Sequence, residues 1–181
     1  MAAAAAAFDC QKIIDKIEER FKIVGLESLL EVRPDVESEF YVSLSKKEDI
    51  AEEIAHINGN SFGNGILYIE TLNRYGFGSN NSTKGSGQLL LDLVACFAAK
   101  NNMTLTLVAM PDSAAEMPKN NMRLYNFYER AGLKPKGNER VFAGSRRKHY
   151  KTGANNLRKS LHERYKGGAR QKMAKRRTRK L

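Results

Sequence analysis

The segment that most limits how this chain can fold is an apolar strand followed by a glycine-containing turn, a leucine-rich helix and a second strand. Residues 65–72 are apolar on both faces apart from Glu70 and Thr71, which predicts a central strand. The helix after residues 85–87 carries a continuous apolar stripe, and residues 104–110 read as the second strand. Strands that alternate with helices in this way indicate an α/β layer fold.

The segments on either side add further elements. Apolar residues recur at helical spacing over residues 10–24, which predicts a first helix. Residues 40–44 alternate as a half-buried strand, and Ser45 with Glu48 forms a capping box for a helix over residues 45–57. Near the end we expect a helix over residues 120–131 and a short strand over residues 140–143. Only one strand then precedes residues 65–72.

Charge divides the chain into two parts. Of its 31 Lys and Arg residues, 15 lie in residues 144–181, which hold a single acidic residue, Glu163. This part has no Ile, Val or Phe, so it cannot bury enough apolar surface to fold alone, although residues 156–165 could form a short helix against a surface. We therefore expect a folded domain over residues 1–143 and a basic, mostly disordered tail over residues 144–181.

The tail is dense enough in cations to bind nucleic acid. Neutralising phosphates releases counterions, which gives sequence-independent and salt-sensitive binding. The residues expected to make these contacts are Arg146, Arg147, Lys148, Lys172, Lys175, Arg176, Arg177, Arg179 and Lys180. The alternatives are a solvated tail that aids solubility, attraction to an acidic protein or an anionic membrane surface, and a tail whose lysines are substrates of the domain's own site.

Cysteine and histidine usage argues against several classes of protein. Cys10 and Cys96 cannot make a disulfide framework and are not in a C-x-x-C pair, so we expect free thiols in a reducing compartment. Three scattered histidines offer no metal-ligand cluster. No segment approaches the ~18 apolar residues of a membrane span. The expected location is intracellular: cytoplasm, nucleus or a nucleic-acid-rich assembly such as a ribosome or virion.

The turn before the leucine-rich helix, residues 84–88, is a candidate phosphate site. Glycines at 85 and 87 let a ligand approach the backbone, and the amides that open a helix attract anions. On its own such a turn is more often simple turn chemistry. It matches neither the P-loop nor the dinucleotide-binding fingerprint.

A second motif lies at residues 121–133, which read NMRLYNFYERAGL. It resembles the signature helix of the GNAT superfamily of acetyl-coenzyme A-dependent acyltransferases, in which an Asn precedes by seven residues the Tyr of the block found here at residues 127–133. Residues 82–87, STKGSG, resemble that family's pyrophosphate loop, Arg/Gln-x-x-Gly-x-Gly/Ala, with Ser82 at its first position. The resemblance covers about residues 65–143.

The resemblance implies a mixed sheet flanked by helices, in which the strands at 65–72 and 104–110 splay apart around the cofactor's pantetheine arm. It implies an N-acyltransferase that moves an acetyl group from acetyl-coenzyme A to an amine on a protein or small molecule, without a metal. The family usually has three strands before the one at 65–72, so the first half of this chain is expected to be compact.

The resemblance also implies roles for particular residues. Tyr128 would protonate the departing thiolate, and a backbone amide near Leu72 or Asn73 would stabilise the oxyanion. Glu70 is the candidate general base, because it is the only carboxylate on an otherwise apolar strand. The cofactor-binding residues are expected to be Leu72, Asn73, Ser82, Thr83, Lys84, Gly85, Ser86, Gly87, Gln88 and Asn121.

Plainer interpretations and other functions stay open. Tyr128 could be an amphipathic core residue, Glu70 could sit at a strand end in water, and Asn121 could be only a helix N-cap. A second hypothesis is a GNAT-like domain that has lost catalysis and serves as a binding or structural module, favoured by Ser82 and the short first half. A third is a modifier of a nucleobase amine, held on its polymer by the tail.

Overall fold

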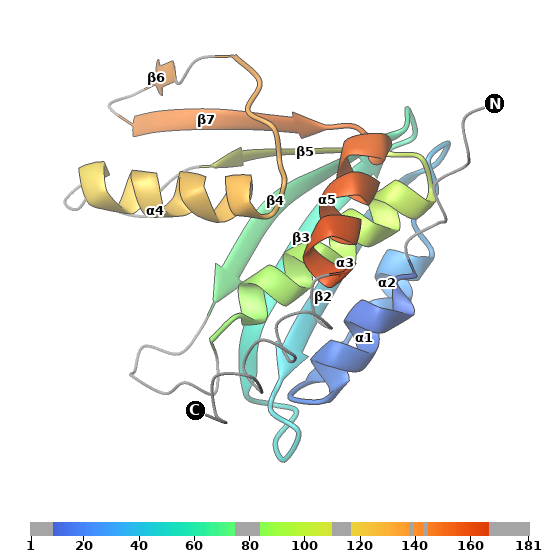
Figure 1. Ribbon diagram of the computed structural model, residues 1–181. Coiled ribbons are helices and arrows are strands. Elements are labelled where there is room, and N and C mark those ends of the chain that lie inside the picture. Colours follow the sequence, from blue (N-terminus) through green and yellow to red (C-terminus); the bar gives the residue numbers. More distant parts are fainter. Residues whose placement is uncertain (1–8, 75–83, 110–116, 138–139, 143–144, 167–181) are drawn as a thin grey trace, which may run out of the picture.

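The computed structural model describes residues 9–74, 84–109, 117–137, 140–142 and 145–166 (Figure 1). The helices are α1 (Gln11–Glu18), α2 (Leu26–Leu30), α3 (Ser86–Lys100), α4 (Met117–Arg130) and α5 (Ala154–Lys166). The strands are β1 (Lys22–Val24), β2 (Glu37–Ser45), β3 (Glu53–Phe62), β4 (Ile66–Arg74), β5 (Thr104–Ala109), β6 (Arg140–Phe142) and β7 (Ser145–Thr152).

The strands form a seven-stranded sheet in the order β1-β2-β3-β4-β5-β7-β6. Strands β4 and β5 run parallel and pair from Ile66 with Thr104 to Ile69 with Leu107, whereas the other neighbours pair antiparallel. Beyond Ile69 the two parallel ribbons diverge (Figure 1). The mixed sheet flanked by helices, with a splayed central pair, is therefore confirmed.

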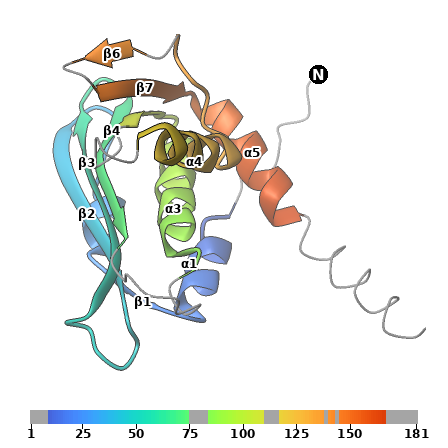
Figure 2. The same ribbon diagram turned by 90° about the vertical axis from the view of Figure 1, so that its left-hand side faces the viewer.

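Helix α3 lies at the centre of the core. Every residue from Leu89 to Ala99 is buried, because this helix is apolar almost all the way round and packs against β2–β5 on one side and against α1 and α5 on the other. Helices α1, α3, α4 and α5 lie on the same side of strands β2, β3 and β4 (Figure 2). On the opposite face the side chains of Glu37, Glu39 and Tyr41 are exposed.

The expected helix over residues 45–57 is wrong, because residues 53–62 form strand β3 between β2 and β4. Ile54 and Ile57 fit a helical spacing, but pairing with strands on both sides outweighs that local pattern. Gly59 suits the strand, since a Cβ there would lie 1.9 Å from the carbonyl oxygen of Tyr68. Three strands therefore precede β4, so the first half is not shortened as expected.

The first helix is also shorter than expected. It ends at Glu18; of the two apolar residues that continue its spacing, Phe21 is buried just before the edge strand β1 and Val24 belongs to that strand. Gly25 follows with a φ of +74° and opens the short helix α2 instead of closing α1. A short edge strand and a helix extension share the same apolar spacing over three residues, so periodicity alone could not separate them.

The folded region extends past Gly144, so the boundary that we expected there lies inside the domain. Strand β7 pairs with β5 on one side and β6 on the other, and its Tyr150 is 2% exposed. Helix α5 buries Leu157 and Leu161 against the core. Main-chain pairing and three apolar side chains are enough to fold this basic segment onto a surface that already exists. The rest of the expected tail, residues 167–181, lies outside the described residues.

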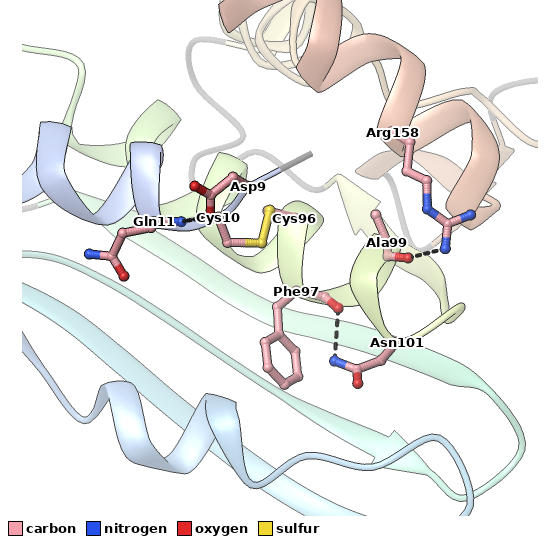
Figure 3. The surroundings of a disulfide bond; sticks show 8 residues. All are labelled: Asp9, Cys10, Gln11, Cys96, Phe97, Ala99, Asn101 and Arg158. Atoms are coloured by element: carbon pink, nitrogen blue, oxygen red, sulfur yellow. Dashed lines mark hydrogen bonds between the residues drawn. A yellow bond between two sulfur atoms is a disulfide. The ribbon is translucent and has the colours of Figure 1, made fainter. Parts of the chain in front are cut away.

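The two cysteines are not free thiols as expected. Cys10 and Cys96 form a disulfide that joins the start of α1 to α3 across a sequence separation of 86 residues (Figure 3). Only the packing of α1 on α3 brings the two residues together, so their spacing in the sequence gave no sign of the pairing. Free cysteines therefore no longer support a reducing compartment. Among the described residues, every helix is too short or too polar to cross a lipid bilayer.

We predict that the double variant Cys10→Ser, Cys96→Ala lowers the free energy of unfolding by about 2–4 kcal/mol, because the bridge closes a long loop in the unfolded chain. Urea unfolding followed by circular dichroism measures the change. Dithiothreitol should produce the same loss in the wild-type protein and none in the variant. An unchanged wild-type midpoint, at a reductant concentration where thiol labelling shows that both cysteines are reduced, would contradict the prediction.

Candidate active site

The centre of the candidate site is the point where β4 leaves β5. Parallel pairing stops at Ile69 and Leu107, while β4 runs on to Arg74. On its other side β4 has a bulge: Asn58 of β3 pairs with Thr71 and Gly59 pairs with Ile69, which leaves Glu70 as the extra residue. A bulge re-aims the side chain that it carries, and here that side chain is the only carboxylate of the strand.

Glu70 lies within β4 and is exposed, on the face of the sheet opposite α3. Its two carboxylate oxygens accept hydrogen bonds from the side-chain amides of Asn60, at 2.6 Å, and Asn58, at 3.3 Å. The two amides come from the neighbouring strand and hold the carboxylate in one orientation. Neither asparagine was expected in the site, because both follow the helix predicted over residues 45–57 and so had no place in a sheet; strand alternation in residues 56–60 was the signal that could have found them.

The glycine turn forms the N-terminus of α3. Gly85 is the N-cap residue with a φ of +87°, where any other residue would be strained, and no side chain caps the helix. The carbonyl of Lys84 accepts a hydrogen bond from the guanidinium of Arg20 at 3.0 Å. A Cβ at Gly87 would lie 3.9 Å from Phe127 Cζ, so the first turn of α3 borders α4. The first amides of a helix have no partner within it and attract anions.

A pocket of about 420 Å³ adjoins this turn on the side of α1 and α5. Three cationic side chains line it, those of Lys16 from α1, Arg20 from the turn after α1 and Arg164 from α5, together with Gly85 and the carboxylate of Asp92. These cations were not singled out from the sequence, because they lie on segments that are distant from the turn along the chain. Cations beside a helix N-terminus suit phosphate groups, because the two electrostatic effects add.

Asp92 holds this side of α3 together. Its buried carboxylate accepts hydrogen bonds from Arg164 at 2.7 Å, from the Tyr165 hydroxyl at 2.8 Å and from the amide of Gln88 at 2.8 Å. Burial raises the pKa of Asp92 and the charge of Arg164 opposes that rise. Burial and the Asp92 carboxylate likewise raise the pKa of Tyr165 far above its ordinary value. In the sequence, the signal that could have found this buried cluster was a single Asp within an otherwise apolar helix.

Tyr128 lies on α4 with its side chain 7% exposed. Its ring packs against those of Phe127 and Tyr150, with centroids 5.2 Å and 5.5 Å away. The Tyr150 hydroxyl lies 3.4 Å from the Glu129 carboxylate, and burial together with that carboxylate raises the pKa of Tyr150. Lys148 pairs with Glu129 at 2.6 Å. The ring of Tyr128 thus packs as a core side chain, and its role as an acid stays a prediction.

The structure places the other predicted residues unevenly. Leu72 and Asn73 lie half-buried near the end of β4, and Ser86 is fully buried at the start of α3. Asn121 belongs to α4, but its side chain is not among the described parts, and Ser82 and Thr83 lie outside the described residues.

Of the residues predicted to bind nucleic acid, Arg147 and Lys148 lie in β7, and Lys148 already serves the packing of α4 on that strand. Arg146 also belongs to β7, although its side chain is not described. Lys172, Lys175, Arg176, Arg177, Arg179 and Lys180 lie outside the described residues. Contact with nucleic acid stays a prediction for the whole set. The described side chains include no group of three or more metal-ligating residues.

Comparisons with known proteins give fold-level likenesses only. No protein-family model and no curated protein matches the chain. Among solved structures, an acyl-CoA N-acyltransferase from Pseudomonas aeruginosa is 11% identical with a TM-score of 0.46, over 64% of this chain and 68% of that one. An acetyltransferase of the GNAT family from Staphylococcus aureus is 12% identical with a TM-score of 0.47, over 84% and 81%.

A third similar structure is that of a candidate streptothricin acetyltransferase from Bacillus anthracis in complex with acetyl coenzyme A. It is 16% identical to this chain with a TM-score of 0.48, over 73% of this chain and 69% of that one. At these identities and scores, what this protein does has to be argued from its own residues.

Asp92 gives a prediction for the dependence of stability on pH. Because its pKa is raised in the folded protein from the ordinary value of 3.8, its contribution to stability is complete below that value and is lost as the pH rises through the folded pKa. The free energy of unfolding of the wild type minus that of Asp92→Asn should therefore fall as the pH rises above the ordinary value of 3.8. Urea unfolding of both proteins at several pH values tests this. A difference that grows with pH would mean that Arg164 outweighs burial.

Proposed function

We propose that this protein is a GNAT-type N-acyltransferase that moves an acetyl group from acetyl-coenzyme A to an amine. The observation that carries the proposal is the bulge at Glu70, which presents a carboxylate at the point where β4 parts from β5. A carboxylate held by two amides beside an opened pair of strands has the parts that amine acylation needs: a base, and a length of β4 beyond Ile69 that β5 does not pair with and that an extended thioester arm could follow.

The residues at the start of α3 fit the phosphates of a coenzyme A thioester. Gly85 and Gly87 leave the first turn without side chains that would block it, and Lys16, Arg20 and Arg164 place positive charge beside it. The thioester supplies an activated acyl group. Backbone amides of residues 84–88 would hold the pyrophosphate, and Asn121 of α4 would contact the pantetheine arm.

In this proposal the acceptor amine attacks the thioester carbonyl carbon, and a backbone amide near Leu72 or Asn73 donates to the oxygen that becomes negative. Glu70 takes the proton that the nitrogen loses and, being exposed, can pass it to water. Tyr128 gives its proton to the sulfur as the carbon–sulfur bond breaks. The alternative of a module without catalysis loses one of its supports, because three strands precede β4.

Titration with acetyl-coenzyme A by calorimetry tests the cofactor site. We expect micromolar-range binding by the wild type, and loss of binding by Gly85→Glu, Gly87→Glu, because both carboxylates would point at the phosphates. Gly153→Glu is the matched control, since a side chain there meets open space, and it should bind as the wild type does. The absence of any heat of binding and of any thermal stabilisation at millimolar acetyl-coenzyme A would contradict the proposal that this protein is an acyltransferase.

Kinetics with an amine acceptor test the two proposed proton-transfer groups. Glu70→Gln should lower kcat/KM by about a hundredfold or more, because a positioned base contributes that much to proton transfer. Tyr128→Phe should lower kcat without changing the affinity for acetyl-coenzyme A. Glu163→Gln, an exposed position on α5, should leave both parameters unchanged. Full activity in Glu70→Gln across the pH range would remove Glu70 from the mechanism.

A further inference from the structure

The face of the sheet opposite α3 is strongly acidic. We call the exposed and half-buried side chains of β2, β3 and β4 on this side the open face: Glu37, Glu39, Tyr41, Glu53, His56, Asn58, Asn60, Phe62, Tyr68 and Glu70. Among the described side chains of these three strands there are four glutamates and no Lys or Arg. The open face therefore carries a concentrated negative charge, although the chain as a whole has a formal net charge of +11.

Aromatic side chains accompany the carboxylates. Phe62 is 47% exposed and Tyr41 is 44% exposed, and the rings of Phe62 and Tyr68 lie 6.2 Å apart. Where β2 begins and β3 ends, the surface is hollowed into a pocket of about 290 Å³, lined by residues 37–39 and 60–62. Two carboxylates beside an exposed aromatic ring suit the side chain of Lys or Arg: the charged end pairs with the carboxylates while the stem lies on the ring.

This pocket shares Asn60 with the site at Glu70. Glu39 is directly opposite Asn60 in the sheet, and Asn60 donates to the Glu70 carboxylate at 2.6 Å. Glu39 and Glu70 lie on strands that are separated by one other strand, so their backbones are about 10 Å apart. An extended chain advances about 3.3 Å per residue and returns a side chain to the same face at every second residue, so cationic residues two or four apart in a bound peptide could match that distance.

We propose that the open face docks a Lys- and Arg-rich polypeptide segment. One lysine reaches Glu70, while a second cationic side chain, two or four residues away, enters the pocket at Glu37 and Glu39. This names the class of acceptor, and its acetylation rests on the proposed function, whereas docking does not. The chain itself contains a segment of this chemistry: residues 167–181 hold seven Lys or Arg and no acid, with Lys172 and Arg176 four apart. Because α5 lies on the helical side of the sheet, we expect such a segment to be supplied by another molecule (Figure 2).

Fluorescence anisotropy with the full-length protein measures docking directly. The probe is a fluorescein-labelled peptide with the sequence of residues 167–181, titrated at low ionic strength in the absence of acetyl-coenzyme A. We expect Glu37→Gln, Glu39→Gln to weaken binding about tenfold, because two exposed charge pairs are lost. Glu18→Gln, Glu19→Gln is the matched control: it removes the same charge from the end of α1, on the helical side, and should bind as the wild type does.

Equal weakening by both double variants would overturn the proposal, since binding would then depend on the overall charge of the protein and not on the open face. Spermine that binds more tightly than the peptide and displaces it would also overturn it, in favour of a small polyamine as occupant. Loss of docking only in Glu37→Gln, Glu39→Gln, with no acetylation of the peptide under any condition, would leave the docking surface standing and refute the peptide as the acceptor class of the proposed function. Acetylation of the peptide with the same KM in both double variants would refute the docking surface and leave the proposed function standing.

Discussion

The burial of α3 is the constraint on which the rest of the structure depends. The helix is held by the sheet on one side, by α1 through the Cys10–Cys96 bridge, and by α5 through the contacts of Asp92 with Arg164 and Tyr165. Its first residues are the glycine turn, so whatever fixes the helix in the core also fixes the backbone amides of the candidate phosphate site. An apolar helix thus positions a polar site without any polar side chain at its own cap.

Strand β4 is irregular on both edges where the candidate chemistry lies. It leaves β5 after Ile69, and it bulges against β3 at Glu70. Each departure costs main-chain pairing, and the sheet tolerates this because β2, β3 and the first half of β4 are paired over most of their length. Irregularity concentrated at one point, beside an acidic and aromatic face, is the pattern expected of a site rather than of a scaffold.

The candidate site was visible in the sequence only where its residues are neighbours in the chain. Gly85, Gly87 and Tyr128 stand in local motifs, and Glu70 is conspicuous as a carboxylate in an apolar strand. Their partners come from other segments: Asn58 and Asn60 from β3, Lys16 and Arg20 from α1 and the turn after it, and Arg164 from α5. No spacing relates such residues, because contacts between elements are set by packing and strand order.

By itself the sequence determined the central strand, the leucine-rich helix, the strand after it and helix α4, because each is marked by a dense apolar run or an apolar stripe bounded by turn residues. The tertiary structure decided the rest. Residues 53–62 became a strand because β2 and β4 offer pairing on both sides, and the basic segment after Gly144 joined the sheet because β5 had a free edge for β7. The cysteines became a bridge because α1 packs on α3. Local periodicity reports what a segment can bury, whereas only the assembled fold supplies the partners that choose between alternatives of similar local energy.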